Sequence, residues 1–165
     1  MTAASPRTAA RGGPAPRITV QCATTARNVP AAAHIRRWAR AALTKDAQVT
    51  IRIVGMAEGR LLNRSYRGKD YATNVLTFVF RERPPFAGDL ALCAPVITRE
   101  ARAQRKPVAA HYAHMIMHGL LHLQGCDHDN EKDAAAMEHR ERALLARFGY
   151  PDPYRPLPTF RSRTD

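Results

Sequence analysis

Residues 118–128 read HGLLHLQGCDH, and this short stretch combines a helix end with a cluster of histidines. His118 and His122 are four residues apart, so on a helix their imidazoles stand on one face, one turn from each other. Gly125 can adopt the left-handed conformation that ends a helix, which allows the chain to bring His128 back to the same point. Three neutral imidazoles that converge in this way predict an open zinc site whose fourth position is left for water. Such a site is typical of a hydrolase.

Two ligand sets compete, because His114 lies four residues before His118. Three imidazoles on one helix would spread over about 11–12 Å of helix axis, whereas zinc holds each nitrogen at about 2.0–2.1 Å. We therefore expect His118, His122 and His128 to bind one Zn²⁺ ion, with His114 packed beside them or supporting a ligand. Another divalent metal could occupy the same site, and Cys126 is the weaker alternative as a fourth ligand.

The residue after His118 bears on the kind of hydrolase. Metalloproteases of the HExxH type carry a glutamate there as general base, and this chain has Gly119. The chain thus has the histidines of that pattern but lacks the glutamate that acts as general base. A metalloprotease-like hydrolase is therefore only an alternative. Asp127 either orients an imidazole or a water from behind the ligands, or is an ordinary turn aspartate.

The charge balance indicates a polyanionic partner. The chain has 26 Lys and Arg against 14 Asp and Glu, a formal net charge of +12. Such an excess favours nucleic acid, because neutralised phosphates release condensed counterions, although a general enrichment in arginine would give the same count. Three cysteines without a CxxC pair, no signal segment and no apolar run near the ~20 residues of a membrane span predict a cytoplasmic protein without membrane contact.

Periodicity and turn signals predict a single α+β domain over residues 18–154, in which a four-stranded mixed sheet packs with about five helices. The metal site would lie on a helix of the C-terminal half and on the loop that follows it. Residues 1–17 are expected to form a disordered basic arm, and residues 155–165 a flexible tail. The expected strands cover residues 18–23, 48–54, 74–80 and 88–93, and the expected helices cover residues 30–43, 56–66, 95–105, 108–124 and 131–148.

A second candidate site follows the expected helix 56–66. Arg64, Arg67 and Lys69 surround a glycine at the helix end, an arrangement that suits phosphate binding. By itself, a basic turn of this kind is more often a solvated surface.

The histidine stretch resembles the HGxLHLxGxDH signature of the YbeY family, the bacterial endoribonucleases of rRNA maturation. The segment from Asn63 to Phe78, the run Gly88-Asp89-Leu90 and the closing GYPDPY at residues 149–154 are similar to three further blocks of that family. The resemblance covers roughly residues 45–154. Two departures are Cys126, where the family usually has an aromatic residue, and the short loop 81–87.

The resemblance implies a metal-dependent endoribonuclease specific for single strands, which acts in 16S rRNA 3′ end maturation and ribosome quality control. It implies zinc on the three matching histidines and a functional Arg67 close to the metal. We accordingly expect Arg67, His118, His122 and His128 as catalytic residues, with Lys69 and Arg64 binding phosphate. The expected partners are single-stranded RNA, the 16S rRNA precursor and the small ribosomal subunit, and the protein is expected to be a monomer. A non-catalytic ribosome-assembly factor with a structural zinc is the remaining alternative.

Overall fold

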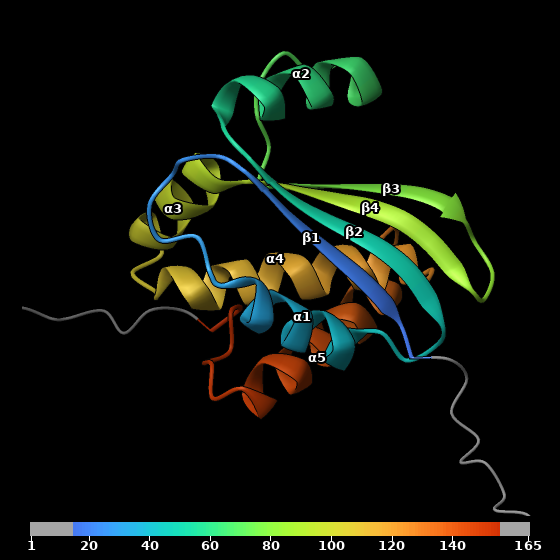
Figure 1. Cartoon of the computed structure of the whole chain (residues 1–165). Helices are drawn as coiled ribbons and strands as arrows, with labels where there is room; N and C mark the ends of the chain where they lie inside the picture. The colour runs from blue at the N-terminus through green and yellow to red at the C-terminus, as the bar shows by residue number, and fades with distance from the viewer. Residues whose placement is uncertain (1–14, 156–165) are drawn as a thin grey trace, which may run out of the picture.

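A four-stranded mixed sheet forms the middle of the molecule (Figure 1). The computed structural model describes residues 15–155, so the predicted arm 1–17 and tail 155–165 lie almost entirely outside the described residues. The strands run in the order β1-β2-β4-β3, with β1, β2 and β4 parallel and β3 antiparallel to β4. Their bounds are β1 Arg17–Ala23, β2 Ala47–Val54, β3 Val75–Arg81 and β4 Phe86–Cys93.

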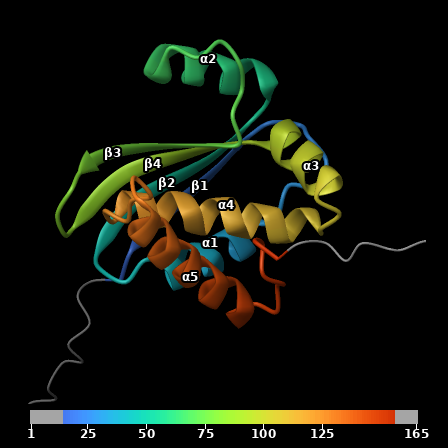
Figure 2. The same cartoon turned by 180° about the vertical axis from the view of Figure 1, so that it is seen from behind.

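Helices cover the two faces of the sheet unequally. Figures 1 and 2 show α1, α4 and α5 on one face, α2 on the opposite face, and α3 at one end of the sheet. Among the described residues, none of these helices is both long and apolar enough to cross a membrane. Their bounds are α1 Ala32–Ala42, α2 Met56–Arg67, α3 Ala94–Ala103, α4 Val108–Leu123 and α5 Glu131–Arg147.

The α+β class, the single domain, the four strands and the five helices are confirmed. Two element starts differ from the expectation by two residues, and the other starts agree within one residue. Helix α1 begins at Ala32 rather than at Pro30, because the first intrahelical hydrogen bonds end on the carbonyl of Ala31. Strand β4 begins at Phe86, two residues early, since Phe86 is already paired with Ala47 of β2.

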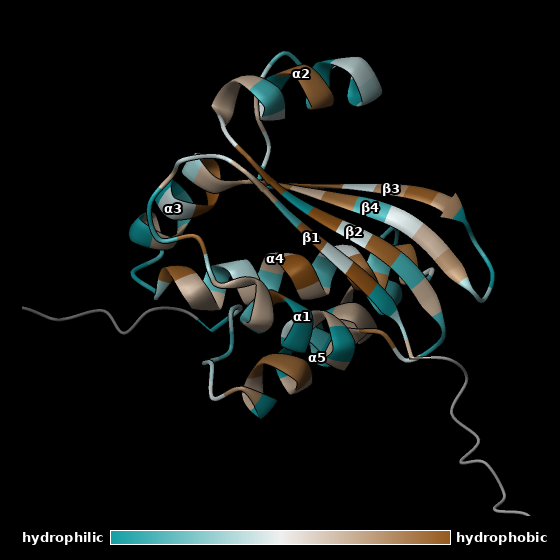
Figure 3. Cartoon of the chain, in the orientation of Figure 1, coloured by the Kyte–Doolittle hydropathy of each residue, from teal (hydrophilic) through white to brown (hydrophobic). Residues whose placement is uncertain are grey.

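The core lies between the sheet and the helices α1 and α4. Strand β2 alternates as a half-buried strand should: Val49, Ile51 and Ile53 point into the core and are at most 1% exposed, whereas Gln48 is exposed. Brown bands broken by white and teal ones follow the same alternation along the strands in Figure 3. Helix α4 is buried over most of its surface because the sheet, α1, α3 and α5 all pack against it.

Two glycines bring α4 close to the sheet below the histidines. A Cβ atom on Gly88 would lie 2.2 Å from Leu123 Cδ1 and 2.3 Å from the carbonyl oxygen of Phe78. A Cβ atom on Gly119 would lie 2.7 Å from Leu90 Cδ2. The C-terminal end of α4 is therefore seated tightly on β3 and β4, and this contact positions the candidate site.

Candidate metal centre

His118 and His122 in the last turns of α4 meet His128 in the loop before α5. Each residue offers one ligand atom, and these three atoms lie within 4.8 Å of one another. The ring centroid of His122 is 4.7 Å from that of His118 and 4.8 Å from that of His128. The loop returns as the sequence predicts, because Gly125 has a φ of +89° after the end of α4. The structure thus brings the three expected ligands together.

The electrostatics of the cluster favour a neutral His122. Burial lowers the pKa of His122, and the neighbouring His118 and His128 lower it further, because a second positive charge so close is unfavourable. A neutral imidazole is the form that binds a metal. The spacing of the three donors therefore fits a single divalent ion such as zinc, and the lowered pKa of His122 favours its metal-binding form.

Glu141 of α5 is the residue of this site that sequence reasoning missed. Its side chain is fully buried, and Oε1 lies 2.5 Å from Nδ1 of His118. A signal was present in the sequence: Glu141 lies midway between Met137 and Leu145, so an acidic residue interrupts the buried stripe of α5 at i, i+4 spacing. An acid in such a position needs polar partners, and it finds them on α4.

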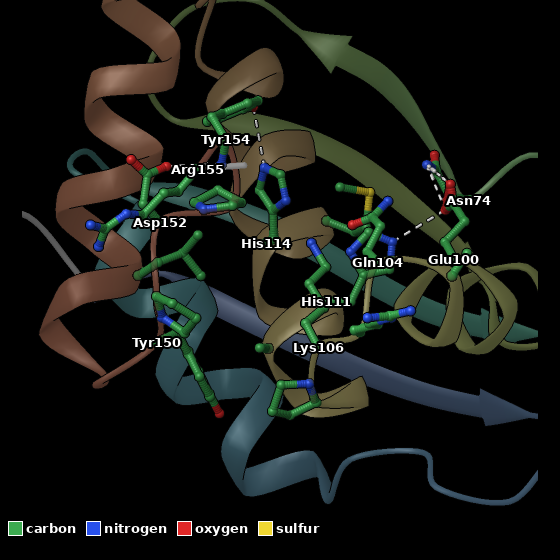
Figure 4. A pocket seen from close by; sticks show the side chains of 18 residues that line it. Asn74, Glu100, Gln104, Lys106, His111, His114, Tyr150, Asp152, Tyr154 and Arg155 are labelled. Carbon is green, nitrogen blue, oxygen red and sulfur yellow. Dashed lines mark hydrogen bonds and ion pairs between the residues drawn. The ribbon is translucent and has the colours of Figure 1, made fainter. Parts of the chain in front are cut away.

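His114 lies outside the histidine cluster. Its Nε2 is 3.0 Å from Oε2 of Glu141 and 3.3 Å from the hydroxyl of Tyr154. Figure 4 shows this imidazole turned toward Tyr154, at the wall of a cavity of about 580 Å³ between α4 and the segment after α5. A smaller cavity of about 200 Å³ lies beside His118 and His128. His114 thus contacts Glu141, which in turn contacts the expected ligand His118.

Asp127 and Cys126 occupy the turn between the ligands. Asp127 is exposed and accepts a hydrogen bond from the backbone N–H of His128 at 2.8 Å. A hydrogen bond with the carboxyl of Asp129, together with this backbone N–H, lowers the pKa of Asp127. Arg140 donates to the sulfur of Cys126 at 3.0 Å. Within residues 15–155, the group of possible metal ligands contains the three histidines and no cysteine.

The basic segment lies on the other face of the sheet. Arg67 is the last residue of α2, and Figures 1 and 2 show that the sheet separates α2 from α4. Arg64, Arg67 and Lys69 are all exposed. The chain turns there through Gly68, whose φ is +68°. No hydrogen bond among the described residues joins this segment to the histidines. A functional role of Arg67 at the metal site therefore stays a prediction.

Comparison with known proteins identifies the family. A family model described as "Endoribonuclease YbeY" matches residues 19–149. The chain belongs to the YbeY family. Two curated YbeY relatives carry the name endoribonuclease: one from Aromatoleum aromaticum is 59% identical over 140 residues and covers 83% of this chain and 91% of the relative. The other, from Nitrosomonas eutropha, is 56% identical over 137 residues and covers 83% and 97%.

One solved structure shares the fold of this chain. The solution structure of TM1509 from Thermotoga maritima superposes with a TM-score of 0.56 at 21% sequence identity, covering 77% of this chain and 87% of that chain. The resemblance predicted from the four sequence blocks is confirmed.

Proposed function

We propose that this protein is a zinc-dependent endoribonuclease that cleaves single-stranded RNA. The observation that carries the proposal is the convergence of His118, His122 and His128, in a chain that belongs to the YbeY family. Relatives at 56–59% identity are named endoribonucleases, which supports a hydrolase acting on RNA. The formal net charge of +12 supports a polyanionic substrate.

Each residue has a distinct part in the proposal. The three imidazoles hold the ion, and the chemistry that such an ion supplies when bound is polarisation of a phosphoryl oxygen and activation of water. Arg67, supported by Lys69 and Arg64, binds phosphate. These three cations suit that part because none forms an ion pair with a carboxylate in the described part of the chain.

The position of Gly119 counts against peptide hydrolysis. A side chain at this position would meet Leu90 and Thr77 of the sheet, at 2.7 Å and 3.3 Å from its Cβ. A glutamate base of the HExxH kind therefore has no room there, and it would not face the histidines. The metalloprotease alternative loses its general base for a steric reason as well as a chemical one.

Membership of the YbeY family supports a wider role as part of this proposal. We place the cleavage in the cytoplasm, at the 3′ end of the 16S rRNA precursor, and in ribosome quality control on the small subunit. A monomer is sufficient for this role, since one chain supplies all three histidines.

The decisive experiment combines metal analysis with cleavage of single-stranded and duplex RNA. His122→Ala is compared with His139→Ala, a matched control that removes an exposed imidazole of α5. We expect His122→Ala to stay folded, to lose its metal and to stop cleaving, whereas the control keeps all three properties. A folded, metal-free His122→Ala protein that still cleaves RNA and supports rRNA maturation would exclude the catalytic proposal.

The same variant tests the assembly-factor alternative. A structural zinc contributes folding free energy, so its loss would unfold the domain rather than only inactivate it.

Arg67→Glu, with Arg147→Glu as a control of equal charge change, tests the proposed role of Arg67 in phosphate binding. We expect only Arg67→Glu to abolish cleavage while zinc stays bound.

The cleaved ends report the chemistry. A 2′,3′-cyclic phosphate on the product would assign the attack to the 2′-hydroxyl of the substrate and would eliminate attack by water.

A further inference from the structure

We infer that Glu141 is a positioning residue, which fixes the tautomer of His118 so that Nε2 faces the metal site. The inference rests on the proposed metal centre and extends it to a residue in α5 outside the histidine motif. Oε1 of Glu141 lies 2.5 Å from Nδ1 of His118. An ionised carboxylate only accepts hydrogen bonds, so Nδ1 must carry a proton, and in the neutral imidazole that binds a metal the lone pair is then on Nε2.

The surroundings of Glu141 keep its carboxylate ionised and oriented. The side chain is 0% exposed, and a buried carboxylate without partners would take up a proton. Three side chains contact this carboxylate: His118 through Nδ1, His114 through Nε2, and Tyr154 through its donating hydroxyl. Glu141 therefore offers acceptor oxygens only, which is the condition for holding the proton on Nδ1 of His118.

The two oxygens of the Glu141 carboxylate have different partners. Nε2 of His114 lies 3.0 Å from Oε2, and the hydroxyl of Tyr154 also donates to Oε2. With Oε2 held in this way, Oε1 is turned toward His118. The buried carboxylate thus connects α4, α5 and the closing segment, which come from distant parts of the sequence.

The closing segment is itself anchored. The carboxylate of Asp152 accepts a hydrogen bond from the backbone N–H of Tyr154 at 2.8 Å and one from Arg142 Nε at 3.1 Å. The guanidinium carbon of Arg142 lies 5.2 Å from the centroid of the Tyr154 ring. These contacts hold the Tyr154 hydroxyl over Glu141. The GYPDPY block at residues 149–154 gains a physical role in supporting the histidine site.

A purely structural role for Glu141 is the competing explanation. Any buried network stabilises the domain when intact and destabilises it when broken, whatever it does to a metal ligand. Only two quantities separate the explanations: the tautomer of His118, and the metal affinity of protein that remains folded. Partners behind a metal ligand typically change affinity by about 10–100-fold, an effect that loss of stability alone does not produce in a folded protein.

The first measurement uses the full chain without metal. Long-range ¹H–¹⁵N NMR reports which nitrogen of His118 is protonated in the wild type, in Glu141→Gln and in Glu141→Leu. The matched control is Glu131→Gln, which changes an exposed acid in the first turn of the same helix. We expect the Nδ1–H tautomer in the wild type and the control, and a mixture of tautomers in Glu141→Leu. An unchanged single tautomer in Glu141→Leu would overturn the inference.

The second measurement is Co²⁺ binding followed by its visible spectrum. We expect Glu141→Leu to bind about 10–100-fold more weakly than the wild type, with Glu141→Gln between the two, because an amide keeps one acceptor but loses the charge. If Glu141→Leu does not fold, Tyr154→Phe removes one donor and should weaken Co²⁺ binding in the same direction. Variants with a lower melting temperature but wild-type Co²⁺ affinity would assign Glu141 a structural role.

Failure of the two proposals can be told apart. A wild-type protein that binds no Co²⁺ or Zn²⁺ refutes the proposed metal centre, and the NMR measurement on the metal-free protein still decides the His118 tautomer. A wild type that binds metal, with Glu141 variants equal to it, refutes the inference alone.

Discussion

Replacing Gly88 by alanine tests how closely α4 is seated on the sheet below the metal centre. The added Cβ would lie 2.2 Å from Leu123 Cδ1 and 2.3 Å from the carbonyl oxygen of Phe78, and real Cβ atoms essentially never approach other atoms within 3.0 Å. The leucine methyl can move, but the Phe78 oxygen belongs to the backbone of β3. Relief therefore requires β3 to separate from β4.

The expected cost follows from two opposing effects. Overpacking a core costs about 1–3 kcal/mol, and an obstacle made of backbone puts Gly88→Ala at the upper end. Alanine also restricts the unfolded chain, which returns about 0.4–1 kcal/mol. We expect a net loss of about 2 kcal/mol in the free energy of unfolding. Because Leu123 follows His122 directly, we also expect weaker Co²⁺ binding.

The assay is urea unfolding of a graded series of glycine variants. Gly119→Ala meets the flexible end of Leu90 at 2.7 Å and gains about 1 kcal/mol of helix propensity, so its loss should be smaller. Gly55→Ala has its nearest atom, Oγ1 of Thr24, at 3.7 Å, so it should cost only the N-cap preference of glycine at the start of α2 and nothing for overpacking. A Gly88→Ala protein within about 0.5 kcal/mol of the wild type, the normal range of surface substitutions, would refute the reasoning.

Three further predictions concern polar contacts. Asn130→Ala removes the N-cap of α5, whose side chain accepts a hydrogen bond from the backbone N–H of Asp133 at 2.8 Å. We expect a loss of about 1 kcal/mol in the free energy of unfolding, measured by thermal unfolding. An unchanged melting temperature would contradict the role of Asn130 as a cap. Asn63→Ala should lower the free energy of unfolding in urea by about 1–3 kcal/mol, because the fully buried Asn63 donates to the carbonyl of Tyr71 at 2.6 Å. A smaller loss than for Asn130→Ala would argue against this contact. The pKa of Glu141 falls from 4.5 to about 2 on folding, so its contribution is complete above pH 5 and is lost as the pH falls toward 2. At about 1.36 kcal/mol per pKa unit this contribution is about 3 kcal/mol, of which about 2 should be lost by pH 3. Urea unfolding of the metal-free wild type and Glu141→Gln between pH 6 and pH 3 measures this loss as a shrinking difference, and a constant difference would refute it.

The features of this protein that depend on neighbours along the chain could be predicted from the residues alone. Strand alternation and helix periodicity follow from residues two to four positions apart, so all nine elements could be predicted, with small errors at their ends. The histidine cluster was predictable for the same reason. His118 and His122 share one helix face, and Gly125 allows the return of His128, so three ligands converge through local geometry alone.

Which distant residues meet depends on how the helices and strands pack together. Alternation shows which side of a strand is buried but not which strand lies beside it, so the order β1-β2-β4-β3 could not be read from the pattern. The contact of Glu141 with His118 joins residues 23 positions apart, and that of Tyr154 with His114 joins residues 40 positions apart. The packing of α5 and the closing segment against α4 creates both contacts. Burial then makes each of these hydrogen bonds necessary, because a buried carboxylate without donors would not stay ionised.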